Sequence, residues 1–183
     1  TVVVTFTDDT TPTANTVTAD ATQNAETGAW TVTDTDLSGL ADGTITVSAV
    51  VTDASGNTAP AATDTLVLDT SADVDSNFSV AVATSDEDTN ADESGNVSVT
   101  LAGIDADAAT VAVTFSDGSA TVSGTASKDV NGDWTVTDTD LSGLADGTIT
   151  VSAVVTDTSG NTSTATDTLD LDTSADVDSN FSV

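Results

Sequence analysis

The sequence predicts an all-β fold in which two-sheet β-sandwiches follow one another in tandem. Three observations predict it: apolar and polar residues alternate along several segments, turn motifs separate these segments, and long stretches of sequence occur twice. Alternation with a period of two places every second side chain on one face of a strand, as in sheets that bury a single face. Helical periodicity does not extend beyond the short turn LSGLADG.

Two duplicated stretches define the domain organisation. The sequence of residues 30–53 recurs at residues 134–157, and that of residues 68–80 recurs at residues 171–183. Internal repeats of this kind are typical of arrays of similar units. They predict a partial repeat at residues 1–69 that holds only the later strands, a complete repeat at residues 70–172, and the start of a third repeat at residues 173–183.

The strands of the complete repeat are predicted from rows of apolar residues at every second position, and the row Ile45, Val47, Ala49 and Val51 forms the equivalent strand in the first copy. Turn motifs containing Gly or Asn separate the rows, at residues 116–118, 130–133, 145–147 and 158–161. We count about seven strands, a number typical of a two-sheet sandwich. The inward rows are Phe78, Val80 and Val82; Val97, Val99 and Leu101; Val111, Val113 and Phe115; Trp134 and Val136; Ile149, Val151, Ala153 and Val155; and Leu169 and Leu171.

Comparison of the two copies tests which strand positions face the core and which face solvent. Val67 of the first copy is replaced by Asp170 in the second, between two leucines that are assigned to the core. A carboxylate is tolerated on the outer face of a strand, whereas burial without a partner is unfavourable. The substitution therefore supports the inward and outward assignment. On the same pattern we interpret Trp134 as a core residue and not as a platform for a ligand.

The charge balance excludes several classes of function. The chain of 183 residues has 31 acidic residues, one lysine (Lys128), no arginine, and a formal net charge of −30. One cation cannot build the basic surface that nucleic acid or an anionic membrane requires. Without His or Cys, the usual general bases and thiol nucleophiles are absent, and paired carboxylates here lack an apolar sugar-binding pocket, so we expect no enzyme.

The strong preference for Asp over Glu indicates cation binding. Asp outnumbers Glu by 28 to 3. Short Asp side chains suit turns and oxygen-rich Ca²⁺ sites, whereas acidity that serves only solvation would use both residues. We therefore favour cation binding over solvation alone. No apolar run is long enough for a membrane span, no signal peptide is visible, and the absence of Met favours a segment of a longer protein.

The run DLSGLADGTITVSAVVTDTSGN at residues 140–161 resembles the second half of bacterial immunoglobulin-like repeats. Such repeats occur in large secreted adhesins, including biofilm adhesins of the repeats-in-toxin class and their ice-binding relatives. The resemblance covers essentially the whole chain. It implies tandem immunoglobulin-like sandwiches, an extracellular location at the bacterial cell surface, and a central extender that projects a distal binding domain. Neighbouring repeats of the same chain would be its partners.

The resemblance also implies Ca²⁺ where consecutive repeats meet. In an immunoglobulin-like topology, the linker at residues 69–77 meets two loops at one end of the complete repeat, and acidic residues at the near end of the first unit (Asp8, Asp9 and Asp42) face the same linker. The second linker repeats the scheme. The predicted metal ligands are Asp69, Asp73, Asp75, Asp105, Asp107, Asp157 and Asn161, with Asp53 as the first-copy counterpart of Asp157, and Asp172, Asp176 and Asp178 in the second linker.

A separate acidic loop at residues 85–96 has oxygen-bearing side chains at alternate positions, as an EF-hand loop does: Asp86, Asp88, Asn90 and Asp92. An EF-hand is rejected because Ala91 stands where Gly is needed and Val97 stands where the bidentate Glu is needed. An irregular cation site and a solvated acidic loop both remain open. The same holds for the acidic pairs after the duplicated Trp, which either protect a sheet edge or bind metal: Asp34 and Asp36, and Asp138 and Asp140.

Three functional hypotheses follow. The first is a Ca²⁺-stiffened extender; the second is a module that binds glycan or ice, for which the Thr-x-Thr pairs would supply a flat face; the third is a passive spacer without metal. Thr also suits the outer face of any strand, so we favour the first. The partial repeat at residues 1–69 is either incomplete or completed by strand exchange with another copy through residues 173–183.

Overall fold

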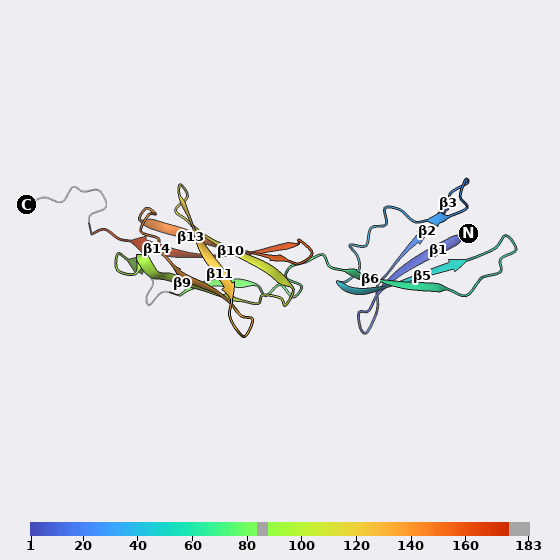
Figure 1. Cartoon of the computed structure of the whole chain (residues 1–183), viewed down its shortest axis with the longest axis horizontal. Helices are drawn as coiled ribbons and strands as arrows, with labels where there is room; N and C mark the ends of the chain where they lie inside the picture. The colour runs from blue at the N-terminus through green and yellow to red at the C-terminus, as the bar shows by residue number, and fades with distance from the viewer. Residues whose placement is uncertain (84–87, 176–183) are drawn as a thin grey trace, which may run out of the picture. The chain divides into compact units, whose positions relative to one another are not determined.

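The structure is a computed structural model that describes residues 1–83 and 88–175. The chain divides into unit 1, Thr1–Thr70, and unit 2, which begins at Ser71 (Figure 1). Strands dominate both units, and among the described residues the single helix is the short 3₁₀ helix η1 at Ser94–Asn96. No helix in this part of the chain is long and apolar enough to cross a membrane. The predicted all-β fold is confirmed.

The described residues of unit 2 form a β-sandwich of eight strands. They are β7 (Ser79–Ala83), β8 (Asp88–Asn90), β9 (Val97–Ala102), β10 (Ala108–Ser116), β11 (Thr121–Lys128), β12 (Trp134–Thr139), β13 (Gly147–Asp157) and β14 (Thr162–Asp172). One layer has the order β7-β9-β12-β11 and the other the order β11-β10-β13-β14-β8. All pairs are antiparallel except β14 with β8, which is parallel.

Strand β11 belongs to both layers. Residues 121–125 pair with β10, and residues 126–128 pair with β12. At the change of partner, a Cβ atom on Gly124 would lie 2.9 Å from Val136 Cγ1 and 3.3 Å from Phe115 Cε2. Only glycine lets the strand pass this close to the core.

The predicted inward rows form the core of unit 2. Strand β13 buries its four predicted positions completely, and Phe115 of β10 is also fully buried. Between the leucines of β14, Asp170 faces solvent, as does its counterpart Val67 with 78 % of its surface exposed. Trp134 packs against this core, as predicted. The other buried members are Ala72, Val80, Val97, Val99, Ala108, Val111, Val113, Val136, Leu141, Leu144, Leu169 and Leu171.

The strand count differs from the prediction by one. The acidic loop at residues 85–96 was predicted to be irregular, but it contains strand β8, which runs parallel to the end of β14, and then η1. Thr89 of β8 is almost fully buried. The short strand has no apolar alternation, because only its middle residue faces the core, and the sequence pattern could not reveal it.

Unit 1 contains one sheet and a short ribbon. The sheet has the order β2-β1-β5-β6 and is formed by β1 (Val2–Asp8), β2 (Thr16–Asp20), β5 (Gly43–Val51) and β6 (Ala62–Leu68). The ribbon pairs β3 (Thr22–Gln23) with β4 (Trp30–Thr31). By sequence, β1, β5 and β6 correspond to β10, β13 and β14 of unit 2.

Truncation of one leucine in each copy tests this packing. Leu141 is fully buried, whereas its counterpart Leu37 is only half-buried in the same local sequence. We expect Leu141→Ala to lower the free energy of unfolding of unit 2 by about 2–5 kcal/mol, because it leaves a cavity. Leu37→Ala, the matched control, should cost unit 1 about 1 kcal/mol. Urea denaturation of the whole chain, followed by NMR signals of each unit, measures both; equal losses would contradict the assigned burial.

Candidate metal centre

One end of unit 2 brings together two loops that the sequence separates by about fifty residues. Strands β10 and β13 pair antiparallel with Ala108 opposite Asp157, so the loop before β10 lies beside the loop after β13. The backbone N–H of Thr158 donates to the carbonyl of Asp107 at 3.1 Å. Carboxylate oxygens of Asp107 and Asp157 consequently lie within 4.8 Å of each other.

Asp157 is buried and organises the turn that follows β13. Its Oδ1 accepts the backbone N–H groups of Ser159, Gly160 and Asn161 at 2.9, 2.6 and 2.8 Å. Its Oδ2 accepts the side-chain amide of Asn161 at 2.7 Å. Burial raises the pKa of Asp157, but the bonds from Asn161, Gly160 and Ser159 outweigh it and leave the pKa below its usual range. Asn161, predicted as a ligand, thus positions this carboxylate.

Asp53 forms the same turn in unit 1. Its carboxylate accepts the N–H groups of Ser55 and Asn57 and the side-chain amide of Asn57, each at 2.8 Å. The side chain of Asn57 is the main cause that lowers the pKa of Asp53. Unlike Asp157, this residue is exposed. Its proposed role as a ligand stays a prediction.

Three further carboxylates converge within unit 2. Asp73, Asp75 and Asp105 each offer an oxygen, and these oxygens lie within 4.8 Å of one another. Asp73 and Asp75 precede β7, and Asp105 lies in the loop between β9 and β10. All three belong to the ligands predicted for this end of unit 2, and the structure brings their carboxylates together.

Main-chain N–H groups hold this cluster in place. Asp73 Oδ1 accepts the N–H of Asn77 at 3.0 Å, and its Oδ2 accepts that of Phe78 at 3.2 Å. Asp105 Oδ2 accepts the N–H of Val74 at 3.0 Å. These bonds fasten residues 73–78 onto the β9–β10 loop.

Gly103 lets the two segments approach closely. Its φ is +70°, and a Cβ atom there would overlap the backbone and side chain of Asn77. The side-chain amide of Asn77 donates in turn to Asp75 Oδ2 at 2.6 Å. The loop conformation and the position of Asp75 therefore depend on a glycine in the left-handed region.

The chemistry of this donor set fits Ca²⁺. Hard carboxylate oxygens are its preferred ligands, and two oxygens on one ion at roughly 2.3–2.6 Å lie at most about 5 Å apart. The oxygens of Asp73, Asp75 and Asp105 lie within 4.8 Å of one another and so are close enough to share one ion. The hydrogen bonds from Val74 and Asn77 reach Oδ2 of Asp105 and Asp75, so within the described part of the chain they leave Oδ1 of both residues for an ion. An ion would also relieve the repulsion among three neighbouring negative charges.

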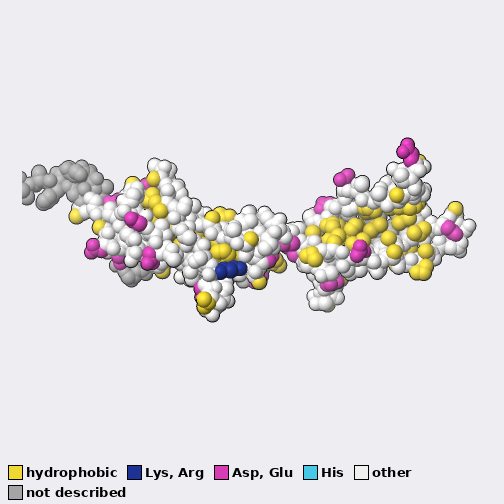
Figure 2. Space-filling view, viewed as in Figure 1, with side chains coloured by type: hydrophobic (Ala, Val, Ile, Leu, Met, Phe, Trp, Pro, Cys, Tyr) yellow, Lys and Arg dark blue, Asp and Glu magenta, His cyan; other side chains and the backbone are white. Residues whose placement is uncertain are grey.

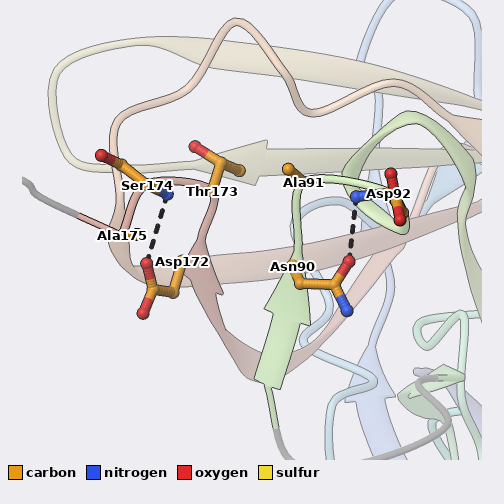
Figure 3. Close-up of a pocket in the computed structure, with 7 residues that line it drawn as sticks. All are labelled: Asn90, Ala91, Asp92, Asp172, Thr173, Ser174 and Ala175. Atoms are coloured by element: carbon orange, nitrogen blue, oxygen red, sulfur yellow. Dashed lines mark hydrogen bonds between the residues drawn. The ribbon is translucent and has the colours of Figure 1, made fainter.

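The opposite end of unit 2 contains a second acidic region, which the sequence analysis had split into two sites. Because β8 pairs in parallel with β14, Asn90 lies opposite Asp172, and both line a cavity of about 420 Å³ together with Asp92 (Figure 3). Asp88 lines a neighbouring cavity of about 380 Å³ with Asp146, Asp170 and Asp172. The predicted ligands Asp86, Asp176 and Asp178 lie outside the described residues.

Several acidic residues accept hydrogen bonds from residues in distant loops, a role that the sequence did not predict. Asp117 accepts the N–H of Ala145 at 2.9 Å, and Asp146 accepts the N–H and hydroxyl of Thr173 at 2.9 and 2.6 Å. Both bonds recur at the equivalent positions of unit 1. There Asp8 accepts from Ala41 and Asp42 from Thr70. The sequence does contain a signal for these bonds, because the acidic acceptor and its donor occur at equivalent positions in both copies.

The acidic pairs after the duplicated Trp have a partly local role. Asp36 and Asp140 accept the N–H groups of Ser38 and Ser142, each at 2.9 Å, and so fix the LSGL turn. The hydrogen bonds of Ser38 and Ser142 lower the pKa of these two carboxyl groups. Asp69, the remaining predicted ligand, follows β6 in unit 1 and is half-buried.

Comparisons with known proteins identify a family and similar structures. The family model of the bacterial Ig-like domain matches residues 73–173, which is more than half of the chain. The comparison with curated proteins found no match.

Three solved structures are similar in sequence. The first is a tetra-tandem repeat from the extending region of a large adhesion protein, with 29 % identity over 93 % of this chain and 41 % of that chain, at a TM-score of 0.43. The second is from a 1.5-MDa bacterial ice-binding adhesin, with 28 % identity over 95 % and 54 %, at a TM-score of 0.43. The third is a Ca²⁺-stabilized adhesin of an Antarctic bacterium that binds ice, with 28 % identity over 93 % and 40 %, at a TM-score of 0.40. The chain spans about half or less of each.

Acidification tests the role of Asp157. Its pKa is lower in the folded protein than in the unfolded chain, so its contribution is complete above about pH 4 and is lost as the pH falls through the lowered folded-state pKa. We expect Asp157→Asn to lower the melting temperature of unit 2 at pH 7 and to flatten the loss of stability below about pH 4. The exposed Asp138 supplies the control: Asp138→Asn should leave the melting curve unchanged. An unaltered pH profile in Asp157→Asn would contradict this role.

Proposed function

Because the chain belongs to the bacterial Ig-like domain family, we propose that it is a structural extender of a large bacterial surface adhesin. In this role, tandem sandwiches separate a distal binding domain from the cell, and the segment itself catalyses no reaction. The observation that carries the proposal is the duplication, since residues 30–53 and 134–157 are identical and belong to successive units. Repeated units of one fold add length without adding a new binding function.

The charge distribution supports a role in spacing. The single cation, Lys128, is used within unit 2: its ammonium lies 5.2 Å from the centre of the Trp134 ring and donates to the carbonyl of Ala108 at 3.2 Å. No other Lys or Arg exists in the sequence. An excess of negative charge keeps such units soluble and discourages association between neighbouring chains.

Ca²⁺ binding by the carboxylate cluster of unit 2 is the second part of the proposal. We assign Asp73, Asp75 and Asp105 as its main ligands, with Asp107 and Asp157 as a neighbouring pair at the same end. An ion here would hold residues 73–77 on the β9–β10 loop. That would shorten the free linker ahead of unit 2 and restrict its movement, which suits an extender.

The opposite end of unit 2 contains a second set of candidate Ca²⁺ ligands. Asp92 and Asp172 line one cavity, and Asp88 lines the next. By repeat position, Asp69 corresponds to Asp172, and Asp176 and Asp178 correspond to Asp73 and Asp75. We include these residues in the same proposal.

Calcium titration tests the assigned cluster. Binding to the folded state alone raises stability by about 2.7 kcal/mol when free Ca²⁺ is a hundred times the Kd. We expect Ca²⁺ to raise the melting temperature of unit 2 and EGTA to reverse the rise. Asp105→Asn should remove most of this effect, while the matched variant Asp138→Asn should keep it. A melting temperature that does not change in millimolar Ca²⁺ would contradict the calcium part of the proposal. The segment would then be a spacer without metal.

Linker dynamics provide an independent measurement. If Ca²⁺ joins Asp73 and Asp75 to Asp105, the ¹⁵N order parameters of residues 73–77 should rise to the values of the neighbouring strands, about 0.85. Mg²⁺ at the same concentration should have less effect, because it demands a smaller, octahedral site. If calorimetry detects Ca²⁺ binding but the order parameters of residues 73–77 do not change, the ion binds at another site.

A further inference from the structure

The hairpin between β11 and β12 ends in a tip that lies outside the core of unit 2. Residues 129–133 form this tip and are all exposed, Val130 completely so. The tip projects from the surface of the unit (Figure 1 and Figure 2). The backbone N–H of Asp129 donates to the carbonyl of Asp133 at 2.8 Å, and that of Gly132 donates to the carbonyl of Asp129 at 3.1 Å. A chemical change at such a tip leaves the buried strands in place.

Asn131 in this tip is the one asparagine of the sequence that a glycine follows. The backbone nitrogen of the next residue can attack the side-chain carbonyl carbon of an asparagine, and a Cβ atom on that next residue hinders the attack. Gly132 has no Cβ. Apart from its neighbours in sequence, no described atom lies within 4 Å of the place where one would be. The nitrogen of Gly132 is therefore less hindered than the nitrogen after any other asparagine of the chain.

Asp129 holds both groups that would react. Its Oδ1 accepts the backbone N–H of Asn131 at 2.8 Å and that of Asp133 at 2.9 Å, and its Oδ2 accepts the side-chain amide of Asn131 at 3.2 Å. Its carbonyl accepts the N–H of Gly132. The attack requires the Gly132 nitrogen to leave this carbonyl and the amide to turn away from the carboxylate. The hydrogen bonds of Asp129 therefore oppose the reaction in the folded turn.

The three Asp–Gly pairs of the sequence could form the same cyclic imide, but their carboxylates are less reactive. A carboxylate that is ionised at pH 7 is a poorer target for a nitrogen nucleophile than a neutral amide. Each of the three also accepts an N–H group from another loop: Asp42 from Thr70, Asp117 from Ala145, and Asp146 from Thr173. Asn131 is thus the residue of this chain that is most open to imide formation.

We propose that Asn131 is a site of spontaneous deamidation and that Asp129 is the positioning residue that restrains its rate. The nitrogen of Gly132 forms a bond to Cγ of Asn131, and the bond from Cγ to Nδ2 breaks. The proton of the Gly132 N–H leaves with Nδ2 as ammonia. Water then opens the cyclic imide at either of its two carbonyl groups, which gives aspartate or isoaspartate. Solvent water is the only co-reactant.

Deamidation would loosen the tip where its hydrogen bonds close it. The amide that donates to Asp129 Oδ2 becomes a carboxylate, so repulsion between like charges replaces a hydrogen bond. The isoaspartate product also adds a methylene group to the backbone of the turn. Lys128 and Trp134 are paired at the register position next to the tip and share the cation–π contact. Their contact is therefore the first that a loosened tip disturbs.

Peptide mapping of the whole chain tests the proposal. The chain is incubated at pH 7 and digested with chymotrypsin, deamidation is followed by mass spectrometry, and isoaspartate is identified with protein isoaspartyl methyltransferase. We expect Asn131 to deamidate at least about tenfold faster than Asn24, an exposed asparagine of unit 1 that Ala25 follows. The original NMR signal of the Trp134 indole should disappear at the same rate, and Asn131→Gln should abolish both changes.

Variants of the two acidic residues separate the hydrogen bonds of Asp129 from its charge. We expect Asp129→Ala to raise the deamidation rate about tenfold, because the Asn131 amide loses its acceptor and the turn loosens. Asp133→Ala removes one negative charge from the same tip but leaves the bonds of Asp129 in place, so the rate should not change. Asp129→Asn keeps an oxygen that accepts the N–H groups and should stay close to the rate of the unaltered chain.

Urea supplies a comparison that needs no variant. The unaltered chain should deamidate at Asn131 more slowly when folded than in urea, where the turn is absent, and Asp129→Ala should have no effect in urea. The proposal is wrong if Asn131 deamidates no faster than Asn24, if folding does not slow the reaction, or if Asp129→Ala and Asp133→Ala change the rate equally. None of these measurements depends on Ca²⁺ or on the role of the chain as an extender.

Discussion

The shortage of positively charged side chains determines how the carboxylates of this protein are stabilised. With one lysine for 31 acidic residues, ion pairs cannot neutralise the carboxylates, so the fold satisfies many of them with main-chain N–H groups. Asp157 accepts three such groups, and Asp117 accepts from both its own turn and the distant Ala145. These bonds lower the pKa of both carboxyl groups and join loops to each other. The acidic residues are thus part of what holds the loops in place.

Asp73, Asp75 and Asp105 are arranged differently from Asp117 and Asp157. They approach one another at the end of unit 2, where the described hydrogen bonds to Asp75 and Asp105 involve Oδ2 of each. Mutual repulsion makes such a cluster unfavourable unless a cation shares it. The same chemistry that suits Asp to turns therefore also suits it to a Ca²⁺ site.

The duplicated stretch shows how far burial depends on context. Ile45 and Ile149 are both fully buried, since neighbouring strands of their own sheets protect them. Val155 is covered because β7 and β9 pack over its sheet, and among the described residues no such strands lie over Val51. The same stretch of sequence is therefore buried to different degrees in different surroundings. The hydrophobic effect responds to the area that is covered, whatever the alternation of the strand.

The amino-acid sequence alone determined the strands, their inward faces and the pairing of the two copies, because period-two alternation and duplication are local properties of the chain. The resemblance to immunoglobulin-like repeats added the strand order, from which Asp73, Asp75 and Asp105 were all predicted to lie at one end of the complete repeat. Only the tertiary structure revealed the parallel strand β8, which brings Asp92 beside Asp172, and the N–H groups that occupy Asp117 and Asp146. These features depend on contacts between residues far apart in sequence, and neither alternation nor composition records which backbone group a carboxylate will meet.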